Sequence, residues 1–164
     1  MASKGFYDWI NGENFNPGRN ITRAEFLHLL IKALDLHAES DGNFSDVSLN
    51  DFYCEAAQVA KKLGIANGIG NNKLGPDEEI TRQDMAALVV RALKTGEWKL
   101  PQASASDLDQ FKDAGDISDY AKESMAILVK AGIIKGYDNS LFPKGKLDMQ
   151  QAATIIYRLY NGSF

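Results

Sequence analysis

Two similar stretches of this sequence place an arginine beside a threonine, at a point where a loop leads into an apolar segment. NPGRNITRAEF and GPDEEITRQDM share a Thr-Arg-x-acid pattern, which consists of Thr22, Arg23 and Glu25 in the first stretch and Thr81, Arg82 and Asp84 in the second. A guanidinium group offers a planar pair of donors to a carboxylate or phosphate, and the free N–H groups of a helix start add further donors. Both stretches are therefore candidate anion-binding sites.

The threonine and the acid of each stretch also have a purely structural interpretation. Thr22 and Glu25 fit a capping box, in which each side chain accepts a hydrogen bond from a backbone N–H at the helix start, and the second stretch repeats the pattern. The arginine is not explained in this way, because a helix start already carries a partial positive charge. Without a ligand, we expect Arg23 and Arg82 to be solvated or to pair with the carboxylates of residues 77–79.

A third copy of the stretch has lost its arginine. FPKGKLDMQQA keeps the proline and offers Asp148 as a helix cap, but Met149 and Gln151 replace the arginine and the acid. Since this helix start does without an arginine, we predict that Arg23 and Arg82 are not needed for folding.

The three copies lie within a longer internal repeat, which reads Phe-x-Asp, leading helix, glycine-containing loop, proline, trailing helix. The Phe-x-Asp motif contributes Asp46 and Asp113, which we expect to cap a helix or to close a loop. Apolar residues at helical spacing predict leading helices over residues 51–63 and around 120–131. The first copy of the repeat is incomplete, because too few residues precede its trailing helix.

The trailing helices are predicted to begin at the caps of the three copies. FLHLLIKAL, MAALVVRAL and AATIIYRLY are apolar almost all round, which is typical of helices at the centre of a fold. A basic residue recurs near their C-terminal ends, as Lys32, Arg91 and Arg158, where the helix dipole favours a cation. The sequence therefore predicts an all-α fold built from three helix-loop-helix repeats.

Composition excludes several classes of function. The chain has 164 residues and a net charge of −4, which gives no sign of a nucleic-acid partner. No apolar run approaches the length of a membrane span, so we expect no membrane insertion, and MASKGFYDW lacks the apolar segment of a signal peptide. Zinc-ligand spacings, phosphate loops and nucleophile elbows do not occur, and His28 has no evident catalytic partner. We expect no enzyme activity, no cofactor and no metal.

Across nearly its whole length the chain resembles the S-layer homology (SLH) domain family. The resemblance is carried, in order, by FSDV, FYCEAAQVAKKLGIANG and ITRQDMAALVVRAL, and again by FKDA, YAKESMAILVKAGIIKG and LDMQQAATIIYRL. It implies a first, incomplete repeat at residues 1–40, a second at 41–97 and a third at 98–164. Together these would form one compact domain with pseudo-threefold symmetry, in which the trailing helices make a central bundle.

The resemblance also implies a function. Members of the family attach non-covalently to an anionic, often pyruvylated, secondary polysaccharide of the Gram-positive cell wall, which implies an extracellular location. In that family the Thr-Arg-x-Glu motif lines grooves between repeats, and its arginine meets the anionic sugar. Carried over to this chain, the motif marks Thr22, Arg23, Glu25, Thr81, Arg82 and Asp84. Met149 and Gln151 depart from the pattern, so we do not expect a third equivalent groove.

Aromatic residues could add stacking contacts with a sugar ring. Trp9, Trp98 and Tyr137 are candidates, and Tyr137 is the best placed because it lies in the loop before the third proline. The alternative function is a protein-interaction or self-assembly module, whose partners would be other cell-surface proteins. An exposed apolar patch would favour that alternative, and a basic groove at Arg23 or Arg82 would favour the polysaccharide.

Overall fold

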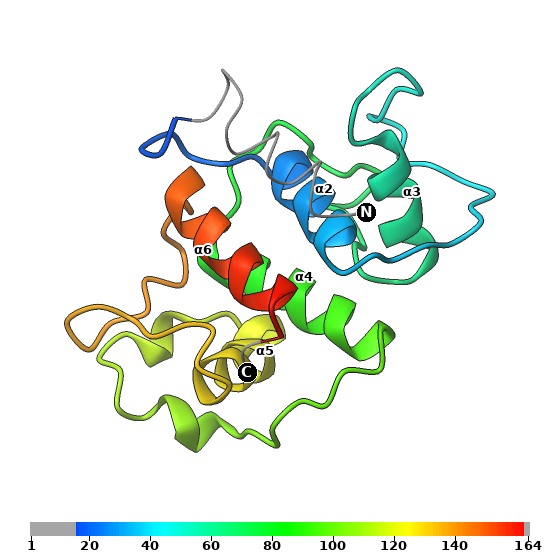
Figure 1. Cartoon of the computed structure of the whole chain (residues 1–164). Helices are drawn as coiled ribbons and strands as arrows, with labels where there is room; N and C mark the ends of the chain where they lie inside the picture. The colour runs from blue at the N-terminus through cyan, green and yellow to red at the C-terminus, as the bar shows by residue number, and fades with distance from the viewer. Residues whose placement is uncertain (1–15, 163–164) are drawn as a thin grey trace.

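The computed structural model describes residues 16–162, which fold into helices joined by long loops (Figure 1). The helices are α2 (Arg23–Ala33), α3 (Cys54–Lys62), α4 (Arg82–Thr95), α5 (Asp119–Lys130) and α6 (Met149–Tyr160), with short 3-10 turns at Ala105–Leu108 and Ala114–Asp116. Within the described residues the extended backbone forms isolated bridges and no strand, so the all-α prediction is confirmed. No described helix has both the length and the apolar character that crossing a bilayer requires. Trp9 lies outside the described residues.

The three trailing helices begin where the sequence predicts. The side chains of Thr22, Thr81 and Asp148 accept hydrogen bonds from the N–H groups three residues on, at 3.2, 3.3 and 2.7 Å. The capping box is complete at Thr22 and at Asp148. The prediction of a second Thr-acid box was wrong, because the Asp84 carboxylate turns away from Thr81 toward Arg23 and Tyr120.

Removing the cap of α2 gives a direct test of this arrangement. Thr22→Ala should lower the free energy of unfolding by about 1 kcal/mol, because the N–H of Glu25 loses its acceptor. Thr81→Ala should cost about as much for the same reason. Urea unfolding of the two variants measures both effects, and an unchanged midpoint in both would show that the threonines do not act as caps.

Short backbone segments before the trailing helices hold the three repeats together. The N–H of Ile21 donates to the carbonyl of Leu147 at 2.9 Å, that of Ile80 donates to Ile21 at 3.1 Å, and that of Leu147 donates to Ile80 at 3.1 Å. These bonds close a cycle, and each residue contributes one donor and one acceptor. The repeats thus meet at three junctions with the same backbone contact. The pseudo-threefold arrangement of complete repeats stays a prediction.

Helix packing crosses the boundaries between repeats. The leading helix α3 packs on α2 of the preceding repeat, and α5 packs on α4 in the same way, while α2 also contacts α4 and α6 (Figure 1). The apolar faces of these helices form one continuous core. Phe52 and Tyr120, which helical spacing in the sequence places on the apolar faces of the leading helices, are instead 58% and 56% exposed. Phe52 precedes α3, and Tyr120 reaches across to α4.

The two aspartates of the Phe-x-Asp motif close the long loops. Asp46 accepts hydrogen bonds from the N–H groups of Leu74 and Gly75 at 2.8 and 2.9 Å. Asp113 accepts the equivalent bonds from Leu141 and Phe142 at 2.9 and 2.8 Å. The prediction of loop closure is confirmed. Each carboxylate fixes the end of the loop that approaches the next trailing helix.

Candidate functional site

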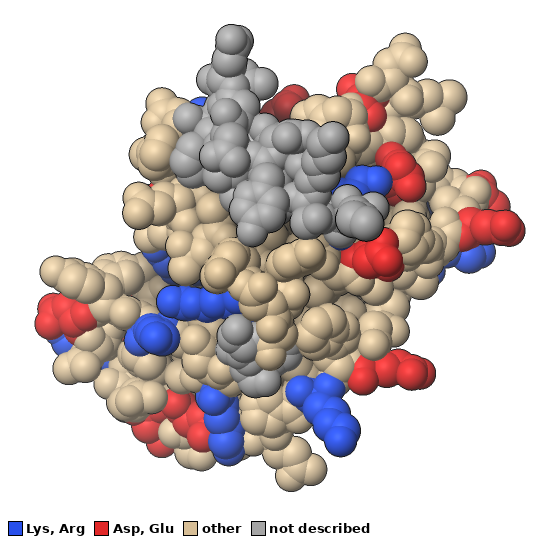
Figure 2. Space-filling model, viewed as in Figure 1, with Lys and Arg blue, Asp and Glu red and all other residues tan. Residues whose placement is uncertain are grey.

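A groove of about 450 Å³ lies at the junction of the second and third repeats. It is formed by the start of α4, the loop that follows α5 and the first turns of α6. Its polar lining comprises Arg82, Lys135, Tyr137, Asp148, Gln150, Gln151, Thr154 and Arg158. Basic side chains gather below α6 on the face shown in Figure 2. The groove therefore combines cations, amides and an exposed aromatic ring in one open site.

Arg82 is one of the cations that line this groove. Its Nη1 donates to the carbonyl of Lys146 at 3.1 Å, and its backbone N–H donates to Gly145 at 3.0 Å. The side chain is half-buried and forms no ion pair with any carboxylate of residues 16–162. Burial lowers the pKa of Arg82, and the negative charge of nearby Asp148 offsets this only in part. Arg82 is therefore a partly desolvated cation, and an anionic ligand would favour its charged form.

Tyr137 stands at the rim of the groove on a tight turn. It is 79% exposed, and it exchanges two backbone hydrogen bonds of 2.9 Å with Ser140. The turn has positive φ angles of 48° and 55° at Asp138 and Asn139, residues that tolerate the left-handed region. At Gly136 φ is 74°, and a Cβ would lie 2.8 Å from the carbonyl oxygen of Ser140. The turn therefore fixes the backbone that carries Tyr137, whose exposed ring can stack on a flat ligand.

Two further arginines of the grooves were interpreted from sequence only as helix-dipole residues. Arg158 donates to the carbonyl of Ile133 at 2.7 Å, and Arg91 donates to Ile65 at 3.3 Å. Each lines the groove formed by its own trailing helix. Each lies ten residues after the cap of its trailing helix, at the same position of its repeat. Their recurrence at one position of the repeat was the signal that could have identified them.

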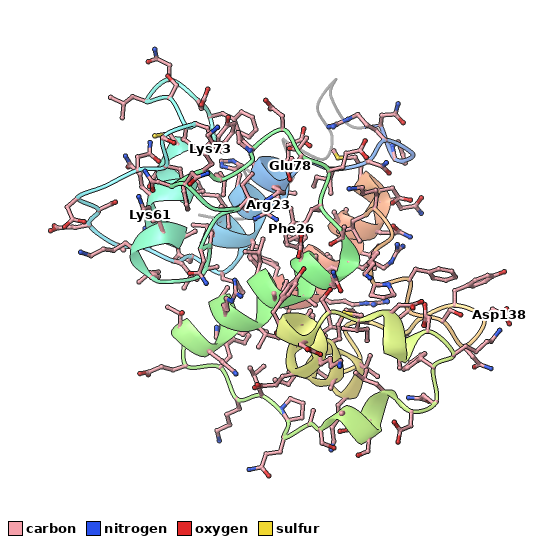
Figure 3. The ribbon with its side chains drawn as sticks, turned by 180° about the vertical axis from the view of Figure 1, so that it is seen from behind. Arg23, Phe26, Lys61, Lys73, Glu78 and Asp138 are labelled. Carbon is pink, nitrogen blue, oxygen red and sulfur yellow. The ribbon has the colours of Figure 1, made fainter. Side chains whose placement is uncertain are left out.

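A second groove, of about 320 Å³, lies at the junction of the first and second repeats. Here Arg23 is only 9% exposed, and its Nε donates to the carbonyl of Leu74 at 3.1 Å. Its Nη1 lies 3.3 Å from Oδ2 of Asp84. The other carboxylate oxygen of Asp84 accepts a hydrogen bond from the hydroxyl of Tyr120. Figure 3 shows Arg23 beside the start of α2, with Glu78 on the neighbouring loop. Arg23 is therefore neither solvated nor paired with residues 77–79, and its buried contacts give it a part in stabilising the fold.

The third junction has a different arrangement. Met149 takes the place of the arginine and is 1% exposed. Arg19 reaches this junction, donates to both carboxylate oxygens of Glu25 at 2.8 and 3.2 Å, and lies 3.5 Å from the sulfur of Met149. Burial alone would raise the pKa of Glu25, but the hydrogen bonds from Arg19 and Thr22 lower it. Glu25 is thus an internal ion-pair partner within the described residues.

The structure separates the seven predicted site residues among three places. Arg82 and Tyr137 line the larger groove, Arg23 and Asp84 line the smaller one, and Glu25 lies at the third junction. The two threonines act as helix caps. Trp98, the other aromatic candidate that the structure describes, is half-buried against the core and lines neither groove.

Comparison with known proteins reveals one family. Residues 10–27, 43–86 and 110–153 match the family model of the S-layer homology domain. The chain is 35% identical to the amylopullulanase of Thermoanaerobacterium thermosulfurigenes and 36% identical to exoglucanase XynX of Acetivibrio thermocellus, in each case over 99% of its length. It is 33% identical to the surface-layer 125 kDa protein of Lysinibacillus sphaericus over 88% of its length. It covers only 9%, 15% and 12% of these proteins respectively.

Proposed function

Because this chain belongs to the S-layer homology domain family, we propose that it attaches a larger protein to the bacterial cell surface by binding an anionic wall polysaccharide in the Arg82 groove. The observation that carries the proposal is the half-buried guanidinium of Arg82, which lines an open groove and has no carboxylate partner among residues 16–162. A net-negative protein can bind a polyanion when its cations are concentrated at one place.

The chemistry of the groove suits a pyruvylated sugar. A pyruvate ketal holds its carboxylate rigidly on the ring, and a planar guanidinium recognises such a group through two parallel hydrogen bonds. Gln151 and Thr154 offer partners for sugar hydroxyl groups, and Tyr137 offers a ring face for stacking. The proposed site therefore consists of one charge contact, a set of neutral hydrogen bonds and one aromatic platform.

The relatives support anchoring rather than catalysis as the role of this module. The chain matches parts of proteins named as glycoside hydrolases and also parts of proteins named as surface-layer proteins. A segment shared by enzymes and by surface-layer proteins is best explained by a common location. We therefore assign the chain to the outside of the cell, at the wall or the S-layer.

A second candidate function is self-assembly or binding to another surface protein. Leu49 and Phe52, just before α3, are 81% and 58% exposed, and both are apolar. Exposed apolar side chains of this kind favour a protein contact.

Co-sedimentation with purified cell walls tests the proposed function. The chain should sediment with intact walls and should remain in solution after the secondary polysaccharide has been extracted, because its ligand is then absent. Leu49→Ser serves as a matched control, since it alters the exposed apolar pair and leaves the Arg82 groove intact. Binding that survives extraction, or that Leu49→Ser abolishes, would favour the protein-interaction module instead.

A further inference from the structure

The three junctions share one backbone contact but differ in charge. The N–H of Arg23 donates to Glu78, that of Arg82 donates to Gly145, and that of Met149 donates to Arg19, at 2.8, 3.0 and 2.8 Å. At each junction the residue whose N–H donates therefore approaches the third residue of another trailing helix. Those opposing residues are Asp84 for Arg23, Gln151 for Arg82 and Glu25 for Met149. These pairs differ in charge from one junction to the next.

At two of the junctions an arginine is paired with a carboxylate of the protein itself. At the first, Asp84 supplies a carboxylate to Arg23, and Tyr120 donates a hydrogen bond to the other oxygen of that carboxylate. Gln83 in turn donates to the hydroxyl of Tyr120 at 3.1 Å, so the carboxylate is held from its outer side. At the third junction Arg19 pairs with Glu25 through both carboxylate oxygens. Arg23 and Arg19 thus each have a carboxylate partner.

The second junction is the exception. Gln151 occupies the position of the acid, and its Oε1 accepts a hydrogen bond from the N–H of Asp148 at 3.1 Å, as part of the capping box. A neutral amide cannot balance Arg82. Asp148, the carboxylate whose charge acts on Arg82, is itself engaged as the cap of α6 through the N–H of Gln151.

We propose that Asp84 closes the Arg23 groove to anions, so that the chain binds one anionic ligand, at Arg82, where Gln151 leaves the cation without a carboxylate. This inference rests on the proposed function, and it assigns the number of ligands and the residues that set it. A ligand carboxylate entering the Arg23 groove would have to displace Asp84. The displaced carboxylate would lose its bonds to Arg23 and Tyr120 and would face a second negative charge.

Substitutions at positions 84 and 151 should exchange the properties of the two grooves, so that the Arg23 groove accepts an anion and the Arg82 groove does not. Asp84→Asn keeps the shape of the side chain and an oxygen for the Tyr120 hydroxyl, but it removes the charge opposite Arg23. Gln151→Glu keeps an oxygen for the N–H of Asp148, as Glu25 does for Thr22, and places a carboxylate opposite Arg82. The first variant should open a groove, and the second should close one.

Calorimetric titration with a monosaccharide glycoside that bears a single pyruvate ketal tests this exchange. Wild type should bind about one equivalent, and Asp84→Asn should bind about two. Gln151→Glu should bind about 10-fold more weakly or worse, since the ligand now competes with an internal carboxylate. The double variant should regain one site, at Arg23. Urea unfolding of each variant confirms that it is folded, and the Gln151→Glu result decides the proposal if Asp84→Asn does not fold.

The outcomes separate this inference from the proposed function. Two equal sites in wild type would overturn the inference and leave the proposed function standing. A single site that persists in folded Asp84→Asn, or full affinity in Gln151→Glu, would also overturn it. Absence of binding by wild type to this glycoside, together with loss of binding to intact walls, would overturn the proposed function itself.

Discussion

Arg82→Met should weaken binding of the wall polysaccharide by about 10- to 150-fold and leave the fold intact. The loss corresponds to about 1.5–3 kcal/mol, which is the usual contribution of a hydrogen bond to a charged group. The fold should survive because the third repeat starts its trailing helix with methionine at the same position, and because the side chain of Arg82 makes one hydrogen bond within residues 16–162, to the carbonyl of Lys146. Titration with a pyruvylated glycoside and urea unfolding measure the two effects separately.

Two further variants show whether the effect belongs to the guanidinium group. Arg82→Lys should restore binding only in part, since it keeps the charge and loses the planar pair of donors. Lys99→Met removes one positive charge from an exposed position that lines neither groove, and it should bind as wild type does. Equal losses in Lys99→Met and Arg82→Met would point to net charge rather than to the groove. Unchanged affinity in Arg82→Met would remove the arginine from the site.

The sequence predicts the fold better than it predicts the site, and the two arginines show why. Helix starts depend on local residues, so the caps at Thr22, Thr81 and Asp148 could be recognised from their neighbours. Arg23 and Arg82 lie in nearly identical local sequences, yet one is buried in an ion pair and the other has no carboxylate partner among residues 16–162.

The difference between Arg23 and Arg82 is caused by the residue that faces each of them from another repeat. Asp84 faces Arg23 although it belongs to α4, which begins at Arg82, 59 residues after Arg23. Gln151 of α6 holds the equivalent position opposite Arg82. No local pattern reveals which residue faces which. The exposed positions of Phe52 and Tyr120 have a similar cause, because each side chain also contacts the preceding repeat, Phe52 at His28 and Tyr120 at Gln83. Residues that act across junctions can be identified only after the repeats have been placed against one another.

Asp46→Ala should lower the free energy of unfolding by about 2–4 kcal/mol, the largest effect on stability that we expect. The substitution removes an acceptor for two backbone N–H groups, those of Leu74 and Gly75, and each hydrogen bond to a charged group contributes about 1.5–3 kcal/mol net of its exchange with water. The expected loss is less than the sum of two such bonds, because Asp46 is partly exposed and water can replace part of each bond. Urea unfolding at neutral pH measures the loss. A change near zero would show that solvent replaces both bonds at no cost.

The effect should also depend on pH. Burial alone would raise the pKa of Asp46, but the N–H groups of Leu74 and Gly75 outweigh it and lower the pKa below its ordinary value. The carboxylate therefore stabilises the fold fully above its unfolded pKa of about 3.9, and this stabilisation is lost as the pH falls through the lower folded pKa. The stability difference between wild type and Asp46→Asn should shrink below about pH 4 for this reason. A difference that stays constant from neutral to acidic pH would contradict the assignment.

Asp113 provides the matched comparison that links stability to function. It makes the same two bonds in the third repeat, to Leu141 and Phe142, and both of these residues line the Arg82 groove. Asp113→Ala should therefore destabilise the fold about as much as Asp46→Ala, and it should also weaken binding of the pyruvylated glycoside, because one wall of the groove is no longer fixed. Asp46→Ala alters the loop beside Arg23, so it should leave that affinity unchanged. Equal losses of affinity in the two folded variants would show that ligand binding depends on overall stability and not on the Arg82 groove.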